Sequence, residues 1–383
     1  MLGRAIRLVP LLGRGFWMST LTIVAKITDQ CNLYCGYCYY YANGNEGLRT
    51  RKEPLATERL AQLGSAIAQI KSRGVFKGVN VVLHGGEPLL VKRPSLEGLI
   101  EPVRNAFGEA ADFSLQTNGV LIDEDWLDFF QDYGIGVGVS IDAVEEFHNE
   151  RRPGARGRPS FSDAVAGYKR LAERAKRNGS NLPGVISVYD ERVTASQYWH
   201  HFVEILEAER FDILFPDEAM ADKRIYDQVC DDFNGLVEEI WEIQTGQDDP
   251  NVRFRFFQNA IAKYGGMRAG KDASANPIVP LVTVDLQGSV FYDDGLRHAI
   301  PANELKVGDW FEDNLSDLAI RMIKRAEEFV QLPERCSECS FLSACGGGEL
   351  TYRYSPISQQ FDSYALCKPS KGIFDYLTEL QPC

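Results

Sequence analysis

The sequence predicts an α/β fold whose core is a parallel sheet made from six successive strand–helix units. Short apolar or β-branched runs alternate with amphipathic stretches over roughly the first two thirds of the chain. Gly-rich or polar motifs follow several of these runs directly, at the carboxyl ends where the sites of barrel folds are built. Repeated strand–helix alternation favours a parallel sheet with right-handed crossovers.

The elements follow from this alternation in chain order. The expected strands are 21–28, 78–84, 111–116, 134–141, 184–189 and 210–216. The expected helices are 57–73, 94–107, 123–133, 161–178, 195–208 and 223–244. Further helices are predicted up to about residue 275, with Phe254, Phe256 and Phe257 as core residues. Two apolar runs around Gln287 and Gly288 then predict a hairpin.

Composition and charge exclude some classes of function. The chain has 383 residues and 44% hydrophobic content, enough for a full core plus an appendage. A net charge of −13 argues against a nucleic-acid surface, which needs clustered Lys and Arg. No apolar run reaches membrane-spanning length, and the first seventeen residues lack a clear cleavage site. We expect a cytoplasmic protein, for which Met18 offers an alternative translation start.

Three cysteines form the most informative motif. Cys31, Cys35 and Cys38 have the spacing C-x3-C-x2-C, with no fourth cysteine nearby. A four-iron four-sulfur cluster normally takes four thiolates, so this triplet would leave one iron open to a small ligand. Zinc is an alternative, but the nearest histidine is His84. Three structural cysteines are a second alternative, although the polar, Gly-containing segment suits a loop.

Three further motifs close predicted strands. His84, Gly85, Gly86, Glu87 and Pro88 follow the run VNVVL. Gln116 to Gly119 close ADFSLQTNG, and Ser140 to Asp142 close GIGVGVSID. Glycines let a backbone approach a ligand closely, and a carboxylate complements an ammonium group. Arg151 and Arg152 come just after, and a guanidinium suits a carboxylate partner.

The cysteine triplet with Tyr37 before its last member, followed by GGEP, QTNG and SID, resembles the radical S-adenosylmethionine (radical SAM) enzymes over roughly residues 20–380. The resemblance implies an open, partial (β/α)6 TIM-like barrel and a 4Fe-4S cluster on the triplet. It also implies S-adenosylmethionine (SAM) as cofactor. The residues that match the cofactor-binding motifs are Tyr37, Gly85, Gly86, Glu87, Gln116, Asn118, Ser140, Asp142 and Arg152, with Arg151 as a second candidate for the cofactor carboxylate.

A second set of cysteines lies near the C-terminus. Cys336, Cys339 and Cys345 are spaced C-x2-C-x5-C, and Cys367 follows later. Four thiolates can hold one further cluster or, as a zinc knuckle, one zinc ion. The segment resembles the SPASM or twitch-type extension of radical SAM enzymes, in which another cysteine stands where this chain has Glu349. We therefore expect one auxiliary 4Fe-4S cluster on these four cysteines, and two clusters in all.

Two cysteines remain outside these sets. We expect Cys230 to be a buried apolar residue and Cys383 to be free. The use of cysteine suits metal ligation in a reducing compartment better than disulfides. The predicted domains are an N-terminal extension (1–20), the radical SAM partial barrel (21–216), a helical bridge (217–279) and the auxiliary-cluster domain (280–383).

The chain most resembles maturases of ribosomally made peptides that end in CGGG-x4-RYS, here from Cys345 to Ser355. Several of these join an aromatic ring to an unactivated side-chain carbon and form cyclophanes. The resemblance implies a radical SAM oxidoreductase that abstracts a side-chain hydrogen from a precursor peptide, with flavodoxin or ferredoxin as reductant. Asp217 is the candidate catalytic base and Asp294 the second candidate, although a strand-end aspartate is also a common helix cap.

Other functions stay open at this point. An anaerobic sulfatase maturase would oxidise Cys or Ser to formylglycine, but enzymes of that type carry cysteines for two auxiliary clusters. Peptide epimerisation and thioether formation are further radical reactions. A non-catalytic iron–sulfur carrier or assembly factor would need no SAM pocket, so the joint presence of GGEP, QTNG and SID weighs against it.

Overall fold

The computed structural model describes residues 18–41, 56–247, 251–268, 280–292, 294–298, 300, 302–329, 332–362 and 364–380. Residues 1–17 of the predicted N-terminal extension, and Cys383, lie outside the described residues. The predicted division of the chain into four segments stays a prediction.

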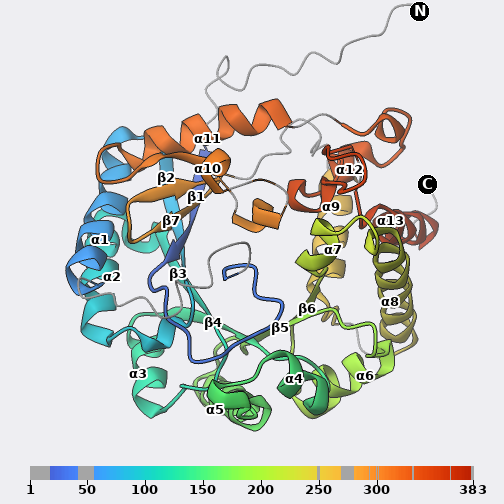
Figure 1. Ribbon diagram of the computed structural model, residues 1–383, viewed down its shortest axis with the longest axis horizontal. Helices are drawn as coiled ribbons and strands as arrows, with labels where there is room; N and C mark the ends of the chain where they lie inside the picture. Colours follow the sequence, from blue (N-terminus) through green and yellow to red (C-terminus); the bar gives the residue numbers. More distant parts are fainter. Residues whose placement is uncertain are drawn as a thin grey trace, which may run out of the picture.

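One nine-stranded sheet runs through the molecule in the order β6-β5-β4-β3-β2-β1-β7-β8-β9. The first six strands pair in parallel with their neighbours in chain order, as the alternation predicts. They are β1 (Met18–Lys26), β2 (Phe76–His84), β3 (Ala111–Thr117), β4 (Ile135–Ser140), β5 (Gly184–Val188) and β6 (Phe211–Leu214). The sheet curves around the centre of the molecule in Figure 1, and the α/β partial-barrel prediction is confirmed.

Helices surround the outer side of this curved sheet in Figure 1. Those of the barrel are α1 (Ala56–Arg73), α2 (Arg93–Phe107), α3 (Glu124–Asp132), α4 (Glu145–Arg151), α5 (Phe161–Asn178) and α6 (Ala195–Trp199). Two details differ from the sequence expectation. The helix expected over 195–208 is α6 followed by a π-helical segment, His200–Ile205, and α4 is an additional short helix between β4 and α5.

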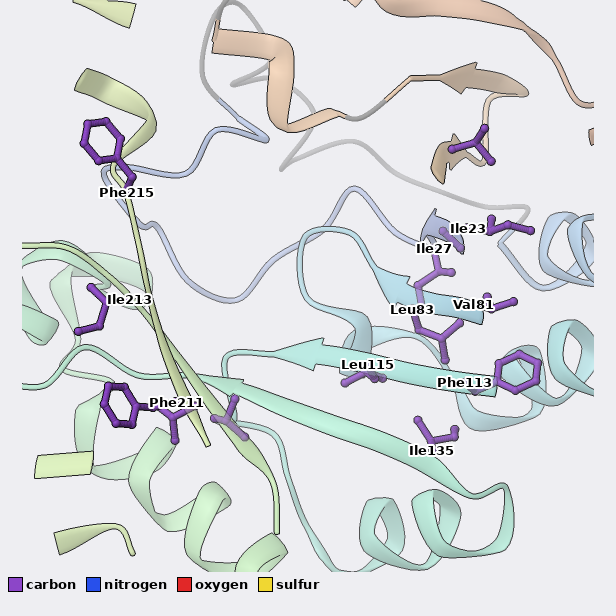
Figure 2. Close-up of a cluster of buried hydrophobic side chains, with 14 of the residues drawn as sticks. Ile23, Ile27, Val81, Leu83, Phe113, Leu115, Ile135, Phe211, Ile213 and Phe215 are labelled. Atoms are coloured by element: carbon purple, nitrogen blue, oxygen red, sulfur yellow. The ribbon is translucent and has the colours of Figure 1, made fainter. Parts of the chain in front are cut away.

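The core lies between the sheet and its helices. Alternate strand residues point to this side, because successive side chains of a strand face opposite ways. Ile23, Val81, Leu115 and Ile213 are all at most 3% exposed, and Figure 2 shows this cluster extending from β1 to β6. The intervening residues at the carboxyl ends of the strands therefore face the barrel interior.

The segment after β1 crosses that interior (Figure 1). We call residues 27–41 the cysteine loop. The backbone N–H of Gly86 donates to the carbonyl of Thr28 at 2.8 Å, and that of Glu87 to Gln30 at 2.7 Å. Further along, the N–H of Tyr34 donates to Pro153 at 2.7 Å, and that of Gly36 to Arg151 at 2.9 Å. Backbone bonds therefore tie the loop to both β2 and the segment after α4.

The remaining elements extend the sheet beyond β1 and continue the ring of helices beyond β6 (Figure 1). Strand β7 (Leu281–Asp285) pairs in parallel with β1, while β8 (Ser289–Phe291) and β9 (Lys306–Asp309) continue antiparallel. The predicted hairpin around Gln287 and Gly288 is confirmed as β7–β8. The helices are α7 (Asp217–Ala221), α8 (Tyr226–Gly246), α9 (Arg255–Arg268), α10 (Ala302–Leu305), α11 (Leu315–Phe329), α12 (Leu342–Cys345) and α13 (Cys367–Leu380).

The predicted aromatic core residues after β6 are partly confirmed. Phe254 and Phe257 are fully buried, whereas Phe256 is only partly buried. Cys230 on α8 is likewise partly buried and packs against the core. In the part of the chain that the structure describes, no helix has the length and apolar character needed to cross a membrane.

Candidate radical and iron–sulfur site

A cavity of about 260 Å³ opens at the carboxyl ends of the strands. We call it the site cavity. Of the predicted site residues, its lining includes Cys31, Cys35, Tyr37, Cys38, Gly85, Gly86, Glu87, Gln116, Asn118, Ser140, Arg152 and Asp217. Motifs that lie far apart along the sequence therefore meet at one place.

The three cysteines of the loop all line the site cavity and are partly exposed. Burial raises the pKa of Cys31 to about 12, although the N–H of Leu33 donates to its sulfur at 3.4 Å. Because iron binds thiolates, loading this site would release the thiol protons. Among the described residues, no three His, Cys, Asp or Glu side chains converge enough to hold a single metal ion. The Cys31 thiol interacts electrostatically with those of Cys35 and Cys38, so as thiolates these three residues could hold a cluster with one open iron.

The two glycines of the GGEP motif are required by the cysteine loop. A Cβ on Gly86 would lie 2.1 Å from the carbonyl oxygen of Gln30 and 2.2 Å from the hydroxyl of Tyr41. Gly85 has φ +146°, and a Cβ there would lie 2.4 Å from the carbonyl oxygen of Thr28. From the sequence, these glycines are expected to let the backbone approach a ligand closely. In the structure, the backbone that approaches them closely is that of the cysteine loop.

Glu87 is 1% exposed, and protein donors occupy its carboxylate. It accepts hydrogen bonds from Leu89 N (3.0 Å), Thr117 Oγ1 (2.7 Å) and Asn118 N (2.9 Å). Burial raises its pKa, while these three bonds act in the opposite direction. The carboxylate therefore joins the end of β2 to the end of β3.

Polar side chains at the ends of β3 and β4 are fixed by one another. Gln116 Nε2 donates to Ser140 Oγ at 2.9 Å, and a Cβ on Gly138 would lie 2.4 Å from Gln116 Oε1. Asn118 Nδ2 donates to Asn32 Oδ1 at 2.7 Å, which connects β3 to the cysteine loop. These amides and hydroxyls are preorganised for hydrogen bonding to a ligand in the cavity.

Tyr37, Asp142 and Arg152 form a buried polar group beside the cavity. Arg152 Nη1 donates to Tyr37 Oη at 2.6 Å, and Tyr37 Oη donates to Asp142 Oδ2 at 3.0 Å. Asp142 also accepts from Ser187 Oγ and from Val188 N, so it lies behind the cavity wall. Arg152 Nε is buried and has no hydrogen-bond partner among the described residues. Arg152 is therefore suited to bind an anionic group in the cavity.

Arg151 does not line the site cavity, although its guanidinium lies 4.4 Å from the centroid of the Tyr37 ring. Its Nη1 donates to the carbonyl of Tyr189 at 3.0 Å and lies 3.3 Å from Asp190 Oδ2. Both arginines therefore contact Tyr37, but of the two only Arg152 lines the site cavity.

His148 stabilises the polar group of Tyr37, Asp142 and Arg152 by hydrogen bonds. Its Nδ1 accepts from the N–H of Asp142 at 3.1 Å, and its Nε2 lies 3.1 Å from Ser160 Oγ. Ser160 Oγ itself donates to the carbonyl of Arg152 at 2.6 Å, so the proton of the imidazole lies on Nε2. Burial lowers the pKa of His148 to about 2, and the ring is neutral.

The two candidate bases have different outcomes. Asp217 is the first residue of α7 and lines the site cavity. Asp294 begins a short 3-10 helix (Asp294–His298), but its side chain lies outside the described residues. The sequence reasoning missed Ser187 and Tyr352, which also line the site cavity. Ser187 alternates with apolar residues in the fifth strand run, whereas no local signal marks Tyr352.

A larger cavity of about 900 Å³ continues into the barrel. This inner cavity shares His84, Gln116 and Ile186 with the site cavity. Asp212 on β6 lines it and accepts from Arg255 Nε at 2.7 Å. Burial raises the pKa of Asp212 to about 6, although Arg255 opposes the shift.

The four C-terminal cysteines lie near one another. The thiols of Cys336 and Cys345 interact electrostatically with each other and with Cys367, and Cys336 also with Cys339. Burial raises the pKa of Cys336 and of Cys345. The glycines after Cys345 have positive φ angles, and a Cβ on Gly348 would lie 2.5 Å from the Tyr364 ring. The glycine run therefore packs tightly beside the thiols.

Glu349 stands where the resemblance to the extension predicts a further cysteine, and its Oε1 lies 3.6 Å from Lys263 Nζ. The two side chains line a small pocket of about 70 Å³ together with Cys345 and Tyr352. Tyr352 also lines the site cavity, so this residue stands between the two groups of cysteines.

Comparison with known proteins places the fold in context. Residues 25–196 match the family model of the radical SAM superfamily. A serine-type anaerobic sulfatase-maturating enzyme from Bacteroides thetaiotaomicron is 25% identical, over 94% of this chain and 89% of that protein.

Two solved structures share the fold. Native anSMEcpe with bound AdoMet and the Cp18Cys peptide has a TM-score of 0.71 at 20% identity, covering 94% of this chain and 97% of that one. Streptococcus suis SuiB bound to the precursor peptide SuiA has a TM-score of 0.56 at 16% identity, covering 91% and 75%.

Proposed function

Since the chain is a radical SAM enzyme, with its radical SAM domain over residues 25–196, we propose that it is a peptide maturase. In this proposal it removes a side-chain hydrogen from a ribosomally made precursor peptide and forms an intramolecular carbon–carbon crosslink of the cyclophane type. The observation that carries the proposal is the site cavity. It brings three cysteines, Arg152 and the carboxylate of Asp217 together, next to a larger cavity that shares His84, Gln116 and Ile186 with it.

The cavity residues fit the cofactors that the family uses. Cys31, Cys35 and Cys38 would hold a 4Fe-4S cluster with one open iron. Arg152, with its buried and unpartnered Nε, would bind the carboxylate of SAM. When bound, these cofactors supply a 5′-deoxyadenosyl radical that abstracts a hydrogen atom from carbon. A reductant such as flavodoxin or ferredoxin would provide the electron.

The chain's own residues would orient the substrate and manage its protons. Gln116 and Ser140 hold each other at the cavity wall and can direct a ligand by hydrogen bonds. Asp217 would accept the proton that leaves the substrate radical when the crosslink forms. Forming the link removes two hydrogens from the peptide, one as an atom and one as a proton plus an electron. We propose an auxiliary cluster on the four C-terminal cysteines as the acceptor of that electron.

A second candidate function is formylglycine formation in a sulfatase. Its support is the whole-chain similarity to a sulfatase-maturating enzyme. The four C-terminal cysteines, with Glu349 paired to Lys263 where a further cysteine would stand, favour the crosslinking enzyme instead. Likeness to SuiB, crystallised with its precursor peptide, is compatible with the peptide substrate. Epimerisation and thioether formation are further outcomes of the test.

The test uses anaerobically reconstituted full-length protein with SAM, a reductant and two substrates in parallel. One is the product of any short open reading frame found beside the gene for this chain, and the other is a sulfatase peptide that contains the target Cys or Ser. We expect about eight irons per chain, 5′-deoxyadenosine, and a precursor peptide lighter by two hydrogens that does not react with hydrazide. Fragment masses would then locate the link.

Other results would replace the proposal. A hydrazide-reactive carbonyl on the sulfatase peptide would establish formylglycine formation. Deuterium uptake from heavy water into a precursor peptide without a crosslink would establish epimerisation. Failure to form 5′-deoxyadenosine from SAM would contradict radical chemistry altogether.

A further inference from the structure

The CGGG-x4-RYS motif contains one cationic residue, Arg353, and the structure buries it. Arg353 is 1% exposed, which makes it one of the largest fully buried side chains. It belongs to the 3-10 helix Leu350–Arg353, and its Nη2 donates to the carbonyl of Phe361 at 3.4 Å. Burying a guanidinium is costly unless negative charge or acceptors surround it.

The C-terminal cysteines would supply this negative charge once they bind iron as thiolates. Arg353 interacts electrostatically with Cys336 and Cys345. A Cβ built on Gly347, the second residue after Cys345, would lie 3.8 Å from Nη1 and 3.9 Å from Cζ of Arg353. The guanidinium therefore lies directly against the glycine run that follows Cys345.

We propose that Arg353 raises the reduction potential of the auxiliary cluster held by Cys336, Cys339, Cys345 and Cys367. This inference rests on the second cluster of the proposed function. Reduction adds one electron to a cluster whose four thiolate ligands already make it negative. A fixed positive charge in a poorly screened interior stabilises the reduced form more than the oxidised form. In the proposed reaction, the substrate radical loses one electron, the cluster gains it, and Asp217 takes the proton.

Arg335 provides a matched control. It also interacts electrostatically with Cys336, and its Nη2 donates to the carbonyl of Tyr364 at 3.3 Å. Arg335 is exposed to solvent, however, so water and salt screen its charge. The two arginines thus separate the effect of a buried charge from that of an exposed one.

The experiment titrates the auxiliary cluster alone. The parent is full-length protein in which Cys31, Cys35 and Cys38 are replaced by Ala, so that only the C-terminal cluster gives an EPR signal. R353K, R353Q, R353M and R335M are reconstituted in this parent, and each is titrated potentiometrically by EPR. We expect the midpoint potential to fall from the parent through R353K to R353Q and R353M, while R335M stays close to the parent.

The results distinguish the two proposals. A parent that binds zinc, or no iron, at these cysteines contradicts the second cluster itself. A parent with its cluster, but equal potentials in R353K and R353Q, overturns the role of Arg353 alone. The same holds if R335M shifts as much as R353M, or if even R353K loses its iron, since Arg353 would then be a packing residue.

Discussion

His148 is a buried residue whose neutral state holds the polar group beside the site cavity together. Its pKa is lowered to about 2 by burial, against about 6.5 in an unfolded chain. Below about pH 6.5 the unfolded chain therefore binds a proton that the folded chain refuses. The stability that His148 contributes is complete above about pH 6.5 and is lost progressively as the pH falls towards 2.

We expect the free energy of unfolding to fall between about pH 7.5 and about pH 5.5, and to fall less in His148→Gln. Urea denaturation at both pH values measures this difference. His200→Gln is the control, because His200 is exposed and pairs with Glu204. Burial lowers the pKa of His201 to about 4. The free energy of unfolding therefore keeps some pH dependence in both wild type and His148→Gln. Equal pH dependence in wild type and His148→Gln would contradict this account.

Asp217 is the residue on which proton removal depends in the proposed reaction. Asp217→Asn keeps the shape of the side chain but cannot accept the proton. We expect 5′-deoxyadenosine still to form while crosslinked peptide falls by about 100-fold or more. Mass spectrometry of both products from one incubation gives the ratio. Asp222→Asn, at the other end of α7 and paired with Arg224, is the control and should leave the ratio unchanged.

At the level of residues, the sequence motifs predicted which polar side chains would lie at the site. They did not predict the partner that each side chain binds. The spacing of the cysteines and the GGEP, QTNG and SID motifs identified most of the polar side chains that line the site cavity, but not its apolar and aromatic lining such as Leu33, Tyr40 and Phe215. The sequence could not separate Arg151 from Arg152, because adjacent residues diverge only once the helix end is built. Glu87 and Asp142 carry carboxylates whose partners, Asn118 and Val188, come from other strands.

The close fit between the β2 end and the cysteine loop predicts a sharp effect of a single methyl group. A Cβ on Gly86 would overlap the carbonyl of Gln30 and displace the segment just before Cys31. We expect Gly86→Ala to fold but to keep only about half of the iron, from the C-terminal cluster. Iron analysis and circular dichroism check this together.

Gly36→Ala is the matched control for that substitution. Gly36 lies between Cys35 and Tyr37 in the same loop, and a Cβ there would meet no atom within 4 Å. The Gly36→Ala variant should therefore keep the wild-type iron content. Equal loss of iron from both variants would mean that the loop tolerates no change, rather than that the β2 contact positions it.

Among the elements, the sequence predicted those with a long regular pattern and missed those decided by tertiary contacts. The six strands and their main helices follow the hydrophobic periodicity closely. Helix α4 spans only Glu145–Arg151, too short for a periodic signal. The pairing of β7 with β1 joins segments that lie far apart in the sequence, such as Lys26 and Asp285, and no local pattern encodes it.

For the molecule as a whole, the two groups of cysteines are expected to have separable functions. We expect the double variant Cys336→Ser and Cys339→Ser to lose about half of the iron and to keep cleaving SAM. Crosslinked peptide should be absent, because the electron from the substrate radical has no acceptor. Iron content, 5′-deoxyadenosine and peptide mass are the measurements.

Cys230→Ser is the control for this double variant, since Cys230 on α8 lies outside both groups. Its iron content and products should match those of wild type. Normal crosslinking by the double variant would show that the second electron leaves the substrate by another route.

The cysteine loop is held by the end of β2 and, further along, by Arg151 and Pro153. During synthesis the three cysteines leave the ribosome early, yet the segment that anchors them emerges more than a hundred residues later. The three cysteines can therefore reach their final arrangement only after the barrel has folded at least as far as residue 153. Iron delivery in the cell should accordingly act on a finished protein, and a nascent chain halted before residue 151 should be unable to retain the first cluster.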